Sequence, residues 1–143
     1  MNMIGRITLI IFQITNSISG FSQESFNIQK YNLEKEKILN LIINSPQFDS
    51  VYKSKRIIII ENDILTKNTP IKLRKGKIKV RIIKKDIIKN REYIVLGDYT
   101  TPKVNPVGAR VQLVNQKKNL ILNVGLIKEN GEWKIINHLI LDD

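Results

Sequence analysis

The sequence predicts an α+β fold in which one main N-terminal helix packs on a curved antiparallel sheet of about five to six strands. Three observations lead to this prediction. Residues 27–44 place apolar side chains at helical spacing, residues 77–83 and 107–115 alternate apolar and polar side chains, and residues 119–141 form two apolar runs joined at a turn. With 143 residues and neither an internal repeat nor a linker, the chain fits one domain.

The predicted helix over residues 27–44 is amphipathic, with charged residues 34–37 expected in solvent. Its apolar face is formed by Tyr31, Ile38, Leu41 and Ile42 and widened by Leu33, Leu39 and Ile43. Ser45-Pro46 should end this helix, because the residue before a proline avoids the α region. The same pair predicts a second short helix or turn over residues 47–52, with Ser45 as its N-cap and Pro46 at its first position.

The first predicted strand, residues 56–61, contains four consecutive isoleucines, and a run without alternation is typical of a strand covered on both faces. Residues 77–83 predict a half-buried strand with Ile78, Val80 and Ile82 on one side. Residues 93–99 form a further strand, in which Gly97 predicts a bend or bulge. Residues 107–115 predict another half-buried strand, with Val107, Ala109, Val111 and Leu113 on its apolar face.

The closing hairpin is the strongest local signal, because Asn130-Gly131 suits a two-residue turn in which both residues have positive φ. A regular register then places Leu126 opposite Ile135, Leu122 opposite Leu139 and Leu120 opposite Leu141. It also places Glu129 opposite Glu132, an unfavourable pair of like charges that a bulged turn would relieve.

The segment Asn130-Gly131-Glu132-Trp133-Lys134-Ile135 resembles the Asn/Asp-Gly-x-Trp-x-Ile signature near the end of many nuclear transport factor two-like and cystatin-like domains. The resemblance covers mainly residues 107–141, and the single early helix fits the smaller cystatin-like variant. It implies a cone-shaped fold in which Trp133 packs beside the last strand, and Trp133 is expected to be a packing anchor. Cystatin inhibitors carry a Gln-x-Val-x-Gly loop, which residues 111–115 do not match, and this argues against cysteine-protease inhibition.

The first 22 residues have the order of a secretory signal peptide. Arg6 provides a basic start, residues 7–14 form a short apolar run, and residues 15–22 are mainly small or polar. Because the run is too short and interrupted to span a membrane, we expect cleavage near residues 20–23 and export to the periplasm or extracellular space. The mature domain, residues 23–143, would keep no stable membrane anchor; the alternatives are a buried N-terminal strand and an anchor.

The sequence offers little conventional catalytic chemistry. The absence of cysteine excludes disulfides, thiolate chemistry and a lipid-bearing cysteine. His138 is the only histidine and is expected opposite Asn123 as an ordinary surface residue, since no nucleophile lies at a recognisable spacing. No metal site and no cofactor are predicted. If the protein is an enzyme, the candidate active site is a polar pocket around Tyr93, Asp98 and Tyr99.

The formal charge of +11 predicts an attraction for anions, although an AT-rich genome also enriches isoleucine, lysine and asparagine. The candidate binding residues are those of a dense basic segment: Lys72, Arg74, Lys77, Lys79 and Arg81. The alternative is an edge strand that its lysines protect against aggregation. Nucleic acid is disfavoured as a partner, because no aromatic residues interleave the basic ones and export is expected.

Three functional hypotheses follow. The main one is an exported, non-enzymatic binding protein that contacts a protein or an anionic ligand through the sheet or the basic strand near residues 72–81. The second is a small enzyme with a polar pocket in a transport-factor-like cone. The third is an inhibitory or immunity-type protein. The sequence leaves the oligomeric state open.

Overall fold

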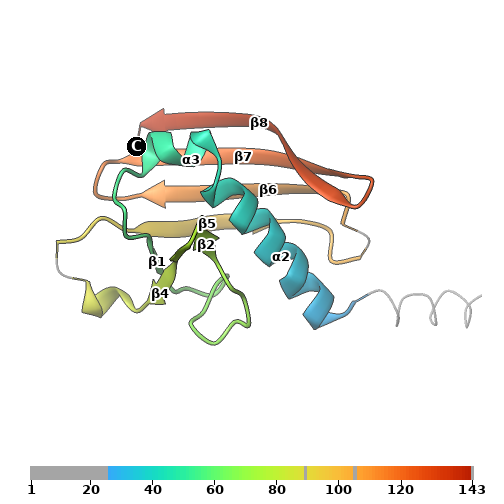
Figure 1. Ribbon diagram of the computed structural model, residues 1–143, viewed down its shortest axis with the longest axis horizontal. Helices are drawn as coiled ribbons and strands as arrows, with labels where there is room; N and C mark the ends of the chain where they lie inside the picture. The colour runs from blue at the N-terminus through green and yellow to red at the C-terminus, as the bar shows by residue number, and fades with distance from the viewer. Residues whose placement is uncertain (1–25, 89, 105, 143) are drawn as a thin grey trace, which may run out of the picture.

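The computed structural model describes residues 26–88, 90–104 and 106–142 (Figure 1). The predicted signal peptide, residues 1–22, lies outside the described residues. The elements in chain order are α2 (Ile28–Ile43), α3 (Pro46–Val51), β1 (Ile58–Ile60), β2 (Arg74–Lys75), β3 (Ile78–Lys79), β4 (Arg81–Ile83), the 3-10 helix η1 (Lys85–Ile87), β5 (Ile94–Thr100), β6 (Gly108–Asn115), β7 (Leu120–Glu129) and β8 (Glu132–Asp142).

The main sheet has six strands in the order β4-β1-β5-β6-β7-β8, so β4 and β8 are its two edges (Figure 1). The strands from β5 to β8 form an antiparallel meander. The prediction of a wholly antiparallel sheet is nevertheless wrong, because β1 runs parallel to both β4 and β5. All three isoleucines of β1 are buried, as in parallel strands that are covered on both faces.

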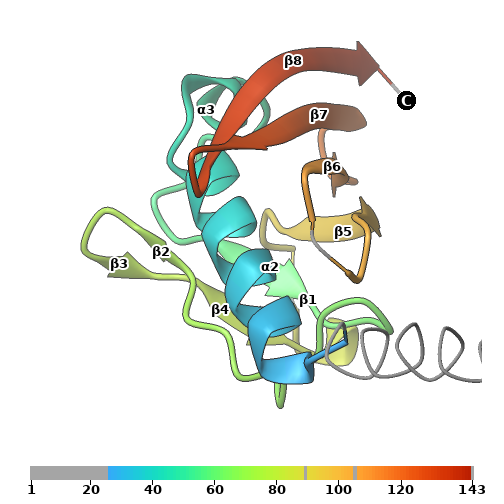
Figure 2. The ribbon, with the colours of Figure 1, turned by 90° about the vertical axis from the view of Figure 1, so that its right-hand side faces the viewer.

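Both helices lie on one face of the sheet, which curves around α2 (Figure 2). Asn27 caps α2 by accepting hydrogen bonds from the backbone N–H groups of residues 29 and 30. The predicted second helix is confirmed as α3, where the Ser45 hydroxyl accepts from the Phe48 N–H and Pro46 begins the helix. The helices and the sheet share one apolar core, whose largest fully buried side chains include Ile38, Leu39, Ile42, Phe48, Ile94, Leu96, Leu113 and Leu122.

The expectation that residues 34–37 lie in solvent is wrong for Glu34 and Lys35, which are only 4% and 5% exposed. Leu33, expected on the apolar face, is 49% exposed instead. The face of α2 that packs on the sheet is therefore rotated relative to the face predicted from the apolar residues, and it includes Glu34 and Lys35. Trp133 is buried, as expected of a packing anchor, and its indole N–H meets the Glu34 carboxylate at 2.5 Å. In this orientation the buried Glu34 carboxylate has the buried Trp133 indole N–H as its hydrogen-bond donor.

The single strand predicted over residues 77–83 is divided at Val80. Its first part, β3, pairs with β2 in a two-stranded sheet, whereas its second part, β4, pairs with β1 in the main sheet. The Val80 N–H donates to the Leu73 carbonyl and the next N–H, that of Arg81, donates to the Ile57 carbonyl. The backbone thus changes partner within one residue, and Ile78 is exposed instead of sharing a buried face with Val80.

The Asn130-Gly131 turn is confirmed, with φ of 52° and 79° at its two residues. Leu126 pairs with Ile135 as predicted, but an irregularity follows between Gly125 and Leu126. The register beyond it therefore shifts by one residue, so that Leu122 pairs with Ile140 and Leu120 with Asp142. The bulge lies in the strands and not at the turn, so Glu129 and Glu132 still pair. The Lys134 ammonium, 3.3 Å from the Glu129 carboxylate, offsets their repulsion.

Two further strand predictions have mixed outcomes. The expected irregularity near Gly97 in β5 is confirmed by a register shift between Leu96 and Asp98. In β6, Ala109, Val111 and Leu113 are buried as predicted. Val107 lies before the strand and is 67% exposed, so the apolar face begins two residues later than the alternation indicated.

Candidate functional site

The basic segment is held on α2 by a ladder of polar side chains. Glu36, Asn40 and Asn44 lie four residues apart and thus share one face of the helix. The Asn40 amide donates to the Lys72 carbonyl at 2.9 Å and accepts from the Arg74 N–H at 2.8 Å. Glu36 accepts from the Lys72 N–H and Asn44 donates to the Arg74 carbonyl. The backbone of this segment is therefore fixed to the helix.

The predicted binding residues keep their charged groups exposed on this fixed backbone. Within residues 26–88, 90–104 and 106–142, no ion pair involves Lys72, Arg74, Lys77, Lys79 or Arg81. Lys75, in contrast, pairs with Asp49 and donates to the Ile43 carbonyl at 3.2 Å. This lysine anchors the β2–β3 hairpin to the helices, while its neighbours remain available to a partner.

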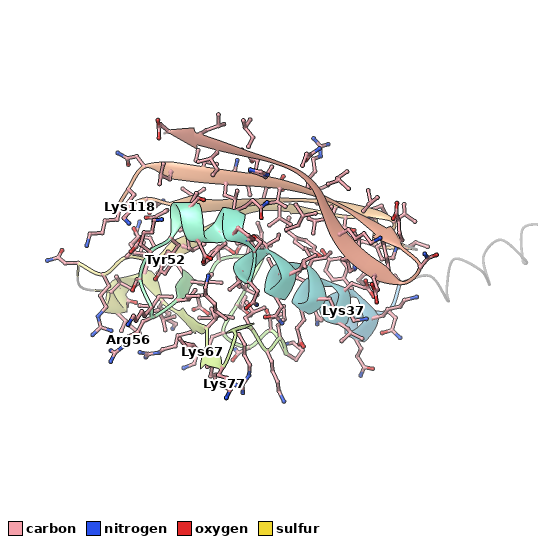
Figure 3. All side chains as sticks on the ribbon, turned by 45° about the horizontal axis from the view of Figure 1, so that its top comes forward. Lys37, Tyr52, Arg56, Lys67, Lys77 and Lys118 are labelled. Atoms are coloured by element: carbon pink, nitrogen blue, oxygen red, sulfur yellow. The ribbon has the colours of Figure 1, made fainter. Side chains whose placement is uncertain are left out.

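Two shallow clefts lie along this edge, and both combine cations with an apolar floor. The first, of about 350 Å³, is lined by Lys67, Ile71, Lys79, Val80, Arg81, Ile82 and Ile83. The second, of about 240 Å³, is lined by Ile71, Lys72, Leu73, Arg74, Lys79 and Val80. Neither lining includes an acidic residue. Figure 3 shows Lys67 and Lys77 on the margin of the molecule opposite β8, together with Arg56. Lys67 is the one cation of the two clefts outside the predicted set of binding residues, because it lies before the basic segment in the sequence.

The charge of the chain is concentrated in this part of the fold. Residues 53–91 contain fourteen lysines or arginines and three acids, which accounts for the whole formal charge of +11. Residues 92–143 contain six of each sign and are neutral. The β1–β4 side of the sheet is therefore strongly basic, and the β5–β8 meander carries no net charge. We call the exposed basic residues Lys67, Lys72, Arg74, Lys77, Lys79 and Arg81 the basic edge.

The structure does not bring the predicted pocket residues together. Asp98 and Tyr99 are adjacent in β5 and point to opposite faces of the sheet, because Tyr99 is buried against α2 whereas Asp98 is exposed. Tyr93 lies outside the strand, where its hydroxyl donates to Gln116 at 2.7 Å. An enzyme pocket built from these three side chains is therefore not formed.

Asp98 instead borders an open polar cleft of about 230 Å³ on the face away from the helices. Gln112 and Asn123 lie beside it and share a hydrogen bond of 3.2 Å. The Asn137 amide covers Gly125, where an added Cβ would lie 2.2 Å from its oxygen. His138 pairs with Val124, not with Asn123 as expected, and so belongs to the helix-side face. The cleft brings polar groups together but pairs no base with a nucleophile.

A third group of polar residues is buried between α2 and the sheet. The Lys35 ammonium donates to the Ile64 carbonyl at 3.0 Å and lies about 5 Å from the ring centres of Tyr31 and Tyr99. Burial lowers the pKa of Lys35 and raises that of Tyr99 far above its usual range. The Tyr99 hydroxyl has no hydrogen-bond partner in the part of the chain described here.

Glu34 completes this buried group and is its best-satisfied member. Its carboxylate accepts from Trp133 and lies 3.0 Å from the Lys128 ammonium. Burial alone would raise the pKa of Glu34, but the hydrogen bonds from Trp133 and Lys128 and the charges of Lys128 and Lys37 outweigh it, so its pKa is lowered. These side chains and the apolar core together fill the space between α2 and the sheet.

The described residues provide no group of three or more metal-ligating side chains, and none of their helices is both long and apolar enough to cross a membrane. A scan against protein-family models, a search of curated proteins and a search of solved structures each found no match.

Proposed function

We propose that this protein is a non-enzymatic binding protein that holds an acidic protein segment along the basic edge. The observation that carries the proposal is the pairing of unneutralised cations with an apolar floor in both clefts. A basic surface steers anions toward it, and the floor offers apolar contact that a purely polar polyanion would not use. The resemblance to cystatin-like domains and the export of the chain stay predictions.

The edge position of β4 also favours its use as a docking site. Among the described residues β4 pairs with a strand on one side only, and the basic residues that flank it discourage pairing with a neutral strand. The protection that lysines give against aggregation and the selection of an acidic partner are thus compatible roles of the same side chains. The polar ladder of α2 keeps the backbone of Lys72 and Arg74 in place before the partner arrives, so less backbone entropy is lost on binding.

The proposal is tested with two labelled peptides of equal charge, one alternating glutamate with leucine and one of glutamate with glycine. Fluorescence anisotropy at moderate salt should show the leucine peptide binding more tightly, because only it uses the apolar floor. The triple variant Lys77→Glu, Lys79→Glu, Arg81→Glu should lose at least tenfold in affinity, since exposed ion pairs contribute roughly 0.2–1 kcal/mol each and reversal adds repulsion.

A matched control changes the net charge equally at exposed residues of other elements. The variant Lys30→Glu, Lys103→Glu, Arg110→Glu should bind the leucine peptide within about twofold of the parent protein, because local contacts outweigh distant charges at moderate salt. Equal losses in the two triple variants would show that net charge alone governs binding, and equal affinity for the two peptides would show that the floor is not used. Either result would contradict the proposal.

A further inference from the structure

The second edge of the main sheet, β8, is longer than β4 and carries fewer charges, and so lacks two properties that protect an edge. It is 11 residues long, whereas β4 has three. Between Lys134 and Asp142 it carries no residue that is charged at neutral pH. Natural edges that avoid pairing are short, charged or bulged away from a neighbour. The bulge of β8 is at Ile136, between the pairs Gly125–Asn137 and Leu126–Ile135, so residues 137–142 remain regular.

No described residue covers the outer end of β8 on either face. All seven residues from 136 to 142 are exposed, and they include Ile136, Leu139, Ile140 and Leu141. On the helix side lie His138, Ile140 and Asp142, which pair with residues 124, 122 and 120. Leu139 and Leu141 lie on the opposite side. Four large apolar side chains on a free strand edge mark an interaction surface.

We infer that β8 pairs with β8 of a second copy of this chain, antiparallel about a two-fold axis at Ile140. This register places Leu139 opposite the second copy's Leu141, and Ile140 opposite its own equivalent. It also places His138 opposite Asp142, a polar pair at each end. A register centred on Leu139 would instead set Ile140 against His138 and Asp142 against Ile136. The Ile140 register is thus the one in which apolar side chains meet apolar ones.

The distribution of charge favours a second copy as the occupant. The formal +11 lies in residues 53–91, on the far side of the sheet from β8 (Figure 1). The neutral meander of residues 92–143 therefore lets two copies approach without strong repulsion. Charged side chains are depleted at the cores of such interfaces. The pairing would continue the sheet across both copies and leave the two basic edges at its outer ends.

Sedimentation of the full chain over a range of concentrations provides the first test. The inference predicts a monomer–dimer equilibrium that Ile140→Lys weakens at least tenfold, because two like charges would lie opposite each other at the axis. Val107→Lys, at an apolar residue that is even more exposed, should change it less than about twofold. A chain that stays monomeric at all concentrations, or equal weakening by both variants, would overturn the inference.

Because the chain lacks cysteine, single cysteines test the register directly. Residues directly opposite in an antiparallel pair have Cα atoms about 4.5–5.5 Å apart, within the range of a disulfide. Ile140→Cys should therefore form a covalent dimer on mild oxidation, whereas Leu139→Cys, offset from its equivalent, should react at least tenfold more slowly. Comparable cross-linking of both variants would overturn the register. Capture of β8 by the leucine–glutamate peptide in a monomeric protein would overturn the second copy as its occupant.

Discussion

Replacing Glu34 by alanine should destabilise the fold by about 3 kcal/mol. The Glu34 side chain is 5% exposed and accepts from Trp133, and a hydrogen bond to a charged group contributes roughly 1.5–3 kcal/mol. The substitution also leaves the Lys128 ammonium without its partner, which costs about 3–5 kcal/mol where the remaining charge is fully buried. Lys128 is 21% exposed and can turn toward water, so the total destabilisation lies well below the sum of the upper limits for the lost hydrogen bond and the unpaired charge.

Urea unfolding followed by far-ultraviolet circular dichroism measures this loss. The control is Glu132→Ala, at an exposed carboxylate opposite Glu129, which should change the free energy of unfolding by less than about 0.5 kcal/mol. A double-mutant cycle with Trp133→Phe should give a coupling energy of about 2 kcal/mol, because each partner is buried with the other. A loss below about 1 kcal/mol for Glu34→Ala would refute the buried contact between α2 and β8.

The pH dependence of this contact has a definite sign. The pKa of Glu34 is lowered in the folded state, so the unfolded state binds the proton first as the pH falls. The stabilisation is present above the ordinary glutamate pKa and is lost at lower pH. The stability advantage of the parent protein over Glu34→Gln should therefore be present at pH 7 and shrink below about pH 4.5. A stability advantage that stays constant down to pH 3 would contradict an ionised Glu34 carboxylate as the source of this stabilisation.

Two further predictions concern Tyr99 and Asn40. Tyr99→Phe should change stability little at pH 7, because the hydroxyl has no partner among the described residues. Burial raises the pKa of Tyr99, so above pH 10 the folded state keeps a proton that the unfolded chain releases, and the parent protein loses stability as the pH rises. Tyr99→Phe should reduce the slope of this loss by at most about 1.4 kcal/mol per pH unit. Alkaline unfolding followed by circular dichroism checks this, and parallel curves for both proteins would contradict it. Asn40→Ala removes both hydrogen bonds to the basic segment, so it should lower the free energy of unfolding by about 1 kcal/mol in urea unfolding and weaken peptide binding severalfold in anisotropy. Its control is Gln29→Ala, on the exposed start of α2. Equal binding by the two variants would show that the ladder does not support the site.

Local signals in the sequence predicted local structure well. Ser45-Pro46 and Asn130-Gly131 carry their conformations in their own side chains and backbones, and both are found as predicted. The parallel pairing of β1, in contrast, could not be predicted from its own residues. Its isoleucines indicated burial on both faces, but whether a neighbour runs parallel depends on residues 61–93, which return the chain to either side of β1.

The candidate site depended on contacts distant in sequence. The division of the basic strand at Val80 reflects competition between Leu73 and Ile57 as backbone partners, and alternation alone cannot reveal it. Glu34 is buried because Trp133 and Lys128, about a hundred residues away, satisfy its carboxylate. The spacing of Glu36, Asn40 and Asn44 is visible in the sequence as a polar stripe four residues apart. That stripe is a usable sequence signal for a docked backbone, and the prediction from apolar spacing alone does not include it.

Amide chemical-shift mapping of the protein titrated with the leucine–glutamate peptide shows whether the basic edge is the binding surface. The perturbed amides should cluster in residues 67–83, along both clefts of the basic edge, and saturation should leave β8 and the polar cleft beside Asp98 unchanged. Perturbations centred on Asp98, Gln112 and Asn123, or spread evenly over every lysine-bearing surface, would exclude the basic edge as the binding surface.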